Sequence, residues 1–164
     1  MDSTKTSDYK FTDGLRDGIP IGLGYLSVSF SFGIAAAGKG ISIFSALLIS
    51  MTNLTSAGQL AGLGIIAAGG TLIEMILTQL VINMRYALMS ISLTQKLDSS
   101  FTVGHRLGTS FGMTDEIFAV AAGKKGDINV RYMYGLILIP FICWSLGTFL
   151  GAAAGNILPD MLKS

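Results

Sequence analysis

An uncharged apolar stretch of about 20 residues constrains this chain more than any other feature of its sequence. Residues 18–38 contain no Asp, Glu, Lys or Arg, and a helix of this length crosses the hydrocarbon core of a bilayer. Pro20 falls in the first turn of such a helix, where proline is tolerated. We therefore expect a membrane protein whose first span covers residues 18–38, preceded by a polar N-terminal tail over residues 1–17.

More apolar segments follow, separated by Gly-rich or charged breaks. They cover residues 41–68, 71–93, 107–123 and 132–157. Only 13% of the residues are charged, about half of the share that is usual in soluble domains. The sequence thus predicts an all-α, polytopic membrane helical bundle over residues 18–164, with about five hydrophobic segments that include interrupted or short helices.

The second apolar segment is polar in its middle. Its polar and small residues there are Ser50, Thr52, Asn53, Thr55, Ser56, Gly58 and Gln59. Such a cluster is tolerated at membrane depth only where it faces protein or a wet cavity. We therefore predict a helix that is interrupted near residues 53–58, as in the substrate sites of secondary transporters. Hydrogen bonding between helices is the alternative interpretation.

The third segment carries charged and amide side chains. Glu74, Thr78 and Arg85 fall within about 40° of one another at 100° per residue, so they form one stripe of the helix. Glu74 and Arg85 are about 16 Å apart along the axis and do not pair with each other. Each is therefore expected either to find a partner elsewhere in the fold or to lie near the headgroups.

Two adjacent carboxylates, Asp115 and Glu116, lie in the middle of the short fourth segment. Carboxylates at membrane depth are rare and usually functional, and at least one of this pair needs a cation, a proton or a donor. The segment is predicted to be a pair of half-helices or a helix surrounded by protein; a solvated loop is the alternative. In the last segment, Gly147, Gly151 and Gly155 are spaced by four residues, which is typical of a helix-packing face.

Several classes of function lack the residues that they need. A formal net charge of +1 without a basic stripe does not favour nucleic-acid binding. The single cysteine, Cys143, and the single histidine, His105, do not supply a disulfide framework or a metal cluster within one chain. Three Lys or Arg residues in the first 17 positions favour a cytoplasmic N-terminus. The charge count of the later loops depends on whether the second and fourth segments cross the membrane fully.

A series of short motifs in this order resembles the AzlC-like family, the large subunit of branched-chain amino acid exporters. The motifs are Pro20-Ile21-Gly22-Leu23-Gly24-Tyr25 with Phe32-Gly33, Ser56-Ala57-Gly58-Gln59, Asn83-Met84-Arg85-Tyr86 and Thr114-Asp115-Glu116. The resemblance runs from about Phe11 to the end of the chain. Members of that family usually continue with further apolar spans, so this chain is expected to lack the last spans of the family.

The resemblance implies export of leucine, isoleucine, valine or analogues across a bacterial inner membrane by a multi-pass permease. It also implies a small hydrophobic AzlD-like membrane subunit as partner and proton-motive force as the energy source. We expect no cofactor, no metal and no nucleic-acid partner. The candidate substrate-binding residues are Asn53, Ser56, Gly58, Gln59, Asn83 and Arg85, and the candidate proton-coupling residues are Glu74, Asp115 and Glu116.

The residues lead to the hypothesis that the second and third segments frame a cavity near the membrane midplane. A half-helix N-terminus or Arg85 would attract the substrate carboxylate, and apolar walls would select an aliphatic side chain. A channel-like subunit and a membrane scaffold without flux are the alternatives. An intramembrane enzyme is the weakest alternative, because we find no nucleophile with a base.

Overall fold

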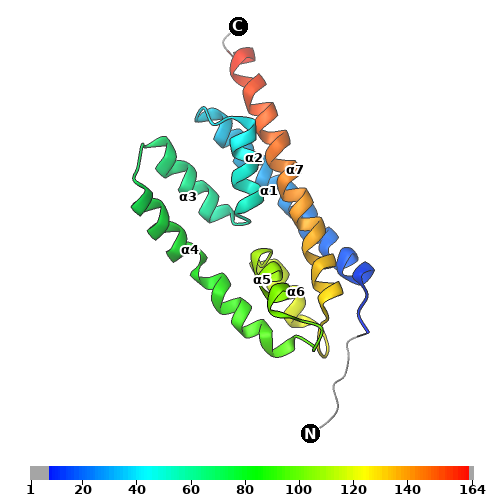
Figure 1. Cartoon of the computed structure of the whole chain (residues 1–164). Helices are drawn as coiled ribbons and strands as arrows, with labels where there is room; N and C mark the ends of the chain where they lie inside the picture. The colour runs from blue at the N-terminus through cyan, green and yellow to red at the C-terminus, as the bar shows by residue number, and fades with distance from the viewer. Residues whose placement is uncertain (1–7, 163–164) are drawn as a thin grey trace. The chain divides into compact units, whose positions relative to one another are not determined.

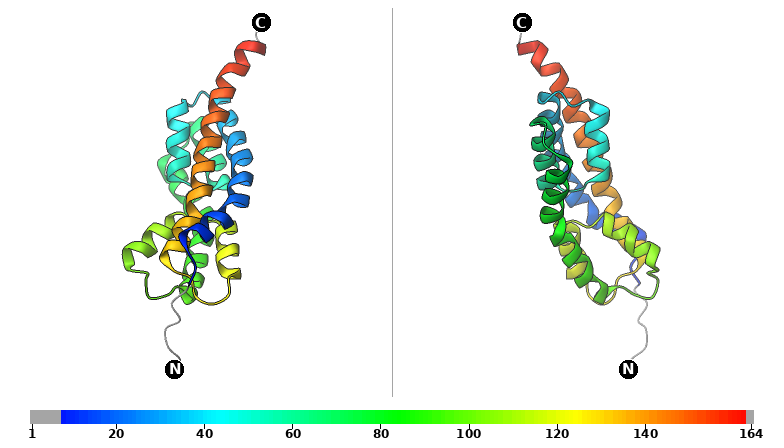
Figure 2. Two further views of the ribbon diagram at one scale, coloured as in Figure 1. Left: turned by 90° about the vertical axis from the view of Figure 1, so that its right-hand side faces the viewer. Right: turned by 60° about the vertical axis from the view of Figure 1, so that its left-hand side comes forward.

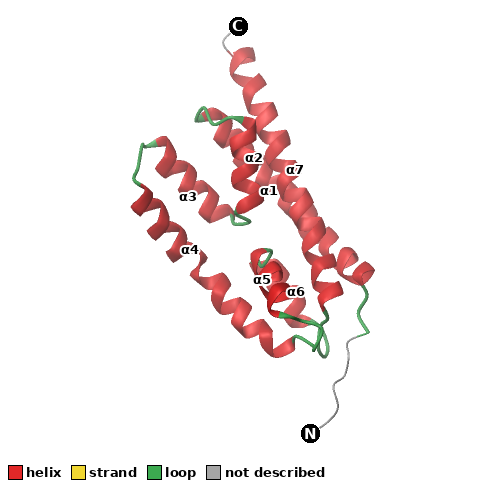
Figure 3. Cartoon of the chain, in the orientation of Figure 1, coloured by secondary structure: helices red, strands yellow, loops and turns green. Residues whose placement is uncertain are grey.

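The computed structural model describes residues 8–162, and side chains for residues 8–157 of these. This part of the chain folds into α-helices joined by short turns, with one isolated bridge between Leu97 and Ile128 (Figures 1 and 3). The helices are α1 (Phe11–Gly38), α2 (Ile43–Thr52), α3 (Ser56–Ala67), α4 (Leu72–Leu93), α5 (Val103–Phe111), α6 (Asp115–Gly123) and α7 (Val130–Leu162), with a 3₁₀ turn η1 (Thr94–Lys96) after α4. The predicted all-α membrane fold is confirmed.

Three helices are long and apolar enough to cross a membrane: α1, α4 continued through η1 to Lys96, and α7 over Val130–Ile157. Helix α1 begins at Phe11 rather than at residue 18, so it includes the second half of the predicted polar tail. Its first turn is stabilised by Asp13, whose carboxylate accepts a hydrogen bond from the Lys10 backbone N–H at 2.8 Å. Residues 1–7 of the predicted tail lie outside the described residues.

The second segment is interrupted, as its polar middle predicts. Helix α2 ends at Thr52, residues 53–55 are extended, and α3 begins at Ser56. The Thr55 hydroxyl accepts a hydrogen bond from the Gly58 N–H at 3.4 Å and so caps α3. Figures 1 and 2 show that α2 and α3 run in opposite directions as a hairpin.

The fourth segment is also a pair of half-helices, α5 and α6, as predicted. Residues 112–114 separate the two helices, and the Thr114 hydroxyl caps α6 by accepting from the Ile117 N–H at 3.4 Å. Each of the two helices has 9 residues, which corresponds to about 14 Å, half of the hydrocarbon thickness. Each helix is therefore too short to cross a bilayer alone. Together α5 and α6 form a second hairpin (Figure 2).

The chain divides into two compact units. Unit 1 contains Met1–Ile21 and Arg85–Pro140, and unit 2 contains Gly22–Met84 and Phe141–Ser164. The long helices α1, α4 and α7 each contribute residues to both units. The core of unit 1 is built around the α5–α6 hairpin and the beginning of α7; its buried apolar residues are Leu93, Phe101, Met113, Ile117, Ala121, Ile128, Tyr132, Met133 and Leu136.

In unit 2, α1 and α7 approach each other so closely that glycine is required at their contact. A Cβ on Gly33 would overlap the backbone at Thr148, and a Cβ on Gly151 would overlap the Phe30 carbonyl. Gly147 meets Ser29 and Leu26 in the same way. The predicted packing face of small residues on the last segment is therefore confirmed as the contact between α7 and α1.

Candidate functional site

The break between α2 and α3 is joined to α4 by one side chain, Gln79. Its Nε2 donates to the Gly58 carbonyl at 2.8 Å, and its Oε1 accepts from Asn53 Nδ2 at 3.2 Å. The same Oε1 accepts from Asn83 Nδ2, one turn along α4, at 3.1 Å. Three predicted site residues, Asn53, Gly58 and Asn83, are therefore brought together. We call these three residues and Gln79 the Gln79 cluster.

Gly58 is the residue that lets Gln79 reach the backbone of α3. A Cβ at this position would lie 2.5 Å from Thr55 Cγ2, 2.7 Å from Gln79 Oε1 and 3.2 Å from Asn53 Nδ2. Real Cβ atoms essentially never approach other atoms that closely, so any side chain here displaces Gln79 or the capping threonine. The close approach explains why the polar break contains a glycine.

Gln59 does not join the Gln79 cluster. It is 1% exposed, and its Nε2 donates to Ser50 Oγ at 2.7 Å. Ser50 Oγ lies 2.6 Å from Thr148 Oγ1 on α7, which donates to the Ser29 carbonyl of α1 at 3.4 Å. The Ser29 carbonyl can only accept, so the Thr148 hydroxyl donates to it. In the bond between Ser50 and Thr148, the Ser50 hydroxyl is therefore the donor. The result is a buried polar chain from Gln59 to α1, within unit 2.

Two of these amide groups have an oxygen that no described group satisfies. Gln59 Oε1 and Asn83 Oδ1 are buried and have no hydrogen-bond partner among the described residues. A buried acceptor without a donor costs about 1–3 kcal/mol. Such atoms in a membrane protein are candidate contacts for water or a solute.

In unit 1, the predicted residues Arg85 and Asp115 form an ion pair. Arg85 Nη1 lies 2.8 Å from Asp115 Oδ2, and the two side chains are 47% and 44% exposed. Arg85 Nη2 also donates to the Tyr86 hydroxyl at 2.9 Å, and the guanidinium lies 4.8 Å from the centre of the Tyr86 ring. Arg85 therefore has a partner elsewhere in the fold, which was one of the two expectations for it, and one carboxylate of the adjacent pair has a cationic partner.

The other predicted residues have simpler surroundings. The Glu74 carboxylate accepts from the Thr71 N–H at 2.7 Å, and the Glu74 N–H donates to Thr71 Oγ1 at 3.2 Å. This reciprocal pair is a capping box at the start of α4, so Glu74 lies at a helix end. Ser56 and Glu116 are exposed in the first turns of α3 and α6.

The hairpin that carries Asp115 is anchored at its other end by charged groups. Lys96 donates to the carbonyls of Ala122 and Lys124, each at 2.5 Å, and so caps the C-terminus of α6. Lys124 also pairs with Asp17 of α1 at 2.6 Å, and the Tyr132 hydroxyl donates to the same carboxylate at 2.7 Å. The C-terminal end of α6 is thus held by η1 through Lys96 and by α1 through the Lys124–Asp17 pair.

Sequence reasoning did not select Gln79, Ser29 or Thr148 as site residues. Gln79 had a detectable signal, because it precedes Asn83 by one turn on an apolar helix. Ser29 and Thr148 are single small polar residues in apolar spans, and the sequence has no signal that distinguishes them from other serines and threonines. Both are fully buried, and only their contacts across helices show that they belong to the chain from Gln59.

The AzlC protein family matches residues 20–158 of this sequence. The chain belongs to the AzlC family. Among known AzlC relatives, it is 30% identical to the inner membrane protein YgaZ of Escherichia coli over 150 residues, which cover 89% of this chain and 61% of YgaZ. It is 34% identical to a membrane protein of Archaeoglobus fulgidus over 148 residues, 90% of this chain and 64% of the relative.

A membrane protein of Helicobacter pylori is 28% identical over 150 residues, with 89% of this chain and 64% of that protein covered. This AzlC chain thus spans a little over three-fifths of the length of the relatives that it matches. No solved structure matches it. The resemblance that the sequence motifs indicated is confirmed at the level of the family, and the relatives agree that it is a membrane protein.

Proposed function

We propose that this chain is the transporting subunit of a proton-coupled exporter of branched-chain amino acids in a bacterial inner membrane. A small hydrophobic AzlD-like subunit would be its partner, and no cofactor would be needed. The observation that carries the proposal is the pair of half-helix hairpins, each broken next to polar side chains. Half-helices of this kind build solute sites at membrane depth, because the freed backbone groups and polar side chains coordinate the solute.

The Gln79 cluster supports a solute site in unit 2. It combines backbone at a helix break with amide side chains from α2 and α4, and it retains an unpaired buried acceptor in Asn83 Oδ1. An amide oxygen accepts from an ammonium group, so the unpaired acceptor of this cluster suits the amino group of an amino acid. Membership of the AzlC family supports transport as the activity.

The two hairpins also determine the proposed membrane topology. In the proposed topology α1, α4 and α7 cross the membrane, and each hairpin enters and leaves it on the same side. Residues 8–10 then lie in the same compartment as the turns at 94–102 and 124–129. These segments are bonded to one another: the Tyr9 hydroxyl donates to the Lys125 carbonyl at 3.1 Å, and the Asp98 N–H donates to the Ile128 carbonyl at 3.0 Å. The compartment holds Lys10, Arg16, Lys96, Lys124, Lys125 and Arg131, whereas the turn after α1 holds Lys39. The positive-inside rule then makes the first compartment cytoplasmic.

Cysteine labelling tests this topology. In a Cys143→Ser background, Lys125→Cys should react with a membrane-impermeant maleimide only in inside-out vesicles, and Lys39→Cys only in right-side-out vesicles. Both positions are exposed, so access to the reagent depends on the side of the membrane. If both cysteines react from the same side, the hairpins do not return as proposed.

Transport is tested by efflux of labelled leucine from proteoliposomes that contain the chain with and without the small partner. The expected result is saturable efflux that requires a pH gradient and is inhibited by isoleucine and valine. Liposomes without protein and liposomes with the partner alone are the controls. Flux that does not saturate would indicate a channel, absence of flux in every combination would indicate a scaffold, and a chemically altered leucine would indicate an enzyme.

A further inference from the structure

In the topology proposed above, the lengths of α4 and α6 each place the Arg85–Asp115 pair near the middle of the membrane. Arg85 is about 12 Å from the C-terminal end of α4, at 1.5 Å per residue. Asp115 begins α6, whose 9 residues extend about 13 Å from the turn at residue 124. The hydrocarbon core is about 30 Å thick, so in this topology both estimates place the pair well below the headgroups, deeper than a side chain that snorkels to the interface.

The pair is nevertheless accessible within unit 1. Both side chains are almost half exposed. Leu88, one turn after Arg85 on α4, is 65% exposed, and Phe111, the last residue of α5, is 53% exposed. A guanidinium has five N–H donors, and the structure assigns one bond to Asp115 and one to Tyr86. The remaining N–H donors leave room for a second carboxylate, which would compete with Asp115 for the same planar guanidinium.

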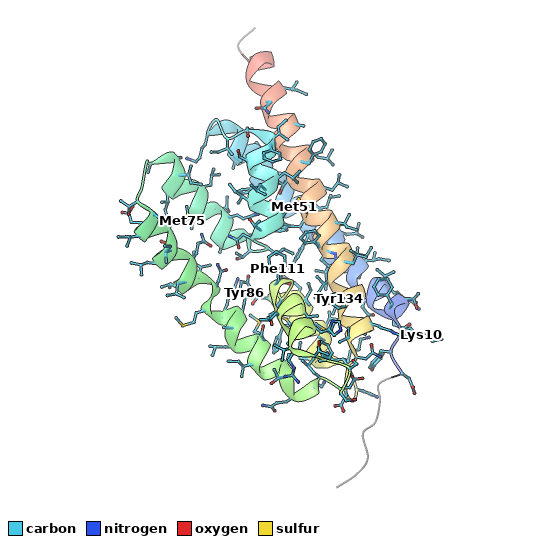
Figure 4. All side chains as sticks on the ribbon, in the orientation of Figure 1. Lys10, Met51, Met75, Tyr86, Phe111 and Tyr134 are labelled. Atoms are coloured by element: carbon cyan, nitrogen blue, oxygen red, sulfur yellow. The ribbon has the colours of Figure 1, made fainter. Side chains whose placement is uncertain are left out.

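The charged and titratable surroundings of Arg85 are few. Asp115 and Glu116 come from α6, and Tyr86 comes from α4 itself. In the same unit, Tyr134 of α7, which is labelled together with Tyr86 in Figure 4, has its hydroxyl 3.3 Å from the ring Nδ1 of His105 of α5. Asp115 is the carboxylate that forms the ion pair with Arg85. Its charge therefore decides how strongly it holds the guanidinium against another carboxylate.

We infer that Asp115 occupies the carboxylate site of Arg85 in the absence of substrate, and that the substrate carboxylate and a proton displace it together. When Asp115 takes up a proton, its bond to Arg85 weakens, and the guanidinium accepts the carboxylate of the solute. When the solute leaves, Asp115 releases the proton and pairs with Arg85 again. This inference rests on the proposed function, and it names the two residues that couple proton and solute.

Binding of L-leucine to the purified chain in detergent, measured by calorimetry, tests the inference. The wild type is measured at pH 7.5 and pH 5.5 and should bind more tightly at the lower pH, by at most about fivefold, the factor that corresponds to the loss of a half-exposed ion pair. Asp115→Asn should bind leucine equally well at both pH values and at least as tightly as the wild type at pH 5.5. Leucinamide, which lacks the carboxylate, should not compete. Asp127→Asn, which removes an exposed carboxylate in the α6–α7 turn, is the matched control and should behave as the wild type.

Arg85→Gln should abolish leucine binding. The double variant Arg85→Gln with Asp115→Asn leaves no unpaired charge at membrane depth; it is expected to fold and yet not to bind. Weaker binding in Asp115→Asn, a retained pH dependence in that variant, or leucine binding by the double variant would overturn the inference.

A panel of other amino acids and short-chain carboxylic acids separates this inference from the proposed function. If leucine does not bind but another carboxylate shows the same dependence on Asp115 and Arg85, the branched-chain assignment is wrong and the inference stands. If leucine is exported and bound independently of Arg85, the inference is wrong and the proposed function stands. If no carboxylate binds to the wild type or to Asp115→Asn, the inference is wrong.

Discussion

Replacing Gly58 by alanine tests whether the break in unit 2 depends on close approach of Gln79. The added methyl would lie 2.7 Å from Gln79 Oε1 and 2.5 Å from Thr55 Cγ2. Gln79 must move away, and its bonds to the Gly58 carbonyl, Asn53 and Asn83 are lost or lengthened. Hydrogen bonds within membrane proteins contribute about 0.6 kcal/mol each, so these three amount to about 1.8 kcal/mol.

The same helix contains a matched control. A Cβ on Gly64 meets no atom within 4 Å, so Gly64→Ala should stabilise α3 by up to about 1 kcal/mol through helix propensity alone. Gly58→Ala gains the same propensity and loses the three bonds, which leaves a net destabilisation of about 1 kcal/mol. The two alanine variants should therefore differ by roughly 2 kcal/mol in unfolding free energy.

Denaturant unfolding of the detergent-solubilised chain, followed by circular dichroism, measures this difference. In a Gln79→Ala background the deficit of Gly58→Ala should shrink, because the displaced side chain is absent and the two changes are not additive. Equal stability of Gly58→Ala and Gly64→Ala would refute the reasoning. A deficit that is unchanged in the Gln79→Ala background would also refute it.

The other predictions concern contacts that hold the candidate site in place. Thr148→Val should lower the unfolding free energy by about 1 kcal/mol, because two hydroxyl bonds across helices are lost. Thr52→Val is the control: it removes only bonds within its own exposed turn and should lower the unfolding free energy less. Equal losses in the same unfolding assay would contradict the buried polar chain. Gly33→Ala should prevent α1 and α7 from packing, while Gly24→Ala, with no atom within 4 Å of its Cβ, should be tolerated; size-exclusion chromatography of the two variants distinguishes these outcomes. Lys96→Met should raise amide hydrogen exchange in the last turn of α6, because two carbonyls lose their ammonium donor, and unchanged exchange there would show that the lysine is not needed as a cap.

Much of the architecture follows from local features of the sequence. The polar middle of the second segment and the carboxylates of the fourth are incompatible with uninterrupted lipid-facing helices, so both interruptions could be predicted from transfer free energies. The glycine spacing in the last segment likewise indicated a close helix contact. The sequence also allowed a short interfacial helix over about residues 9–16, separate from the first span, whereas α1 runs without a break from Phe11 to Gly38 because helix ends tolerate charged residues.

The site was less predictable, because the partner of each polar side chain depends on segments that are distant in the sequence. The structure brings the candidate residues Asn53, Gly58 and Asn83 together through Gln79, which the sequence had not indicated as a site residue. Gln59 was expected among them and instead bonds with Ser50 on α2, the other helix of the hairpin. Its position three residues into α3, past the helix break, determines this choice, and no local pattern indicates it.

The sequence alone determined that the chain is a helical membrane protein of several spans, with polar groups at particular depths. Hydropathy and helix breaks are properties of neighbouring residues, and the cost of exposing them to lipid is set locally. Only the tertiary structure decided which polar groups pair: Arg85 with Asp115, Gln79 with the helix break, and Glu74 with its own helix end. The reason is that a charge or an amide at membrane depth must be satisfied by whichever group the packing of other helices brings within reach.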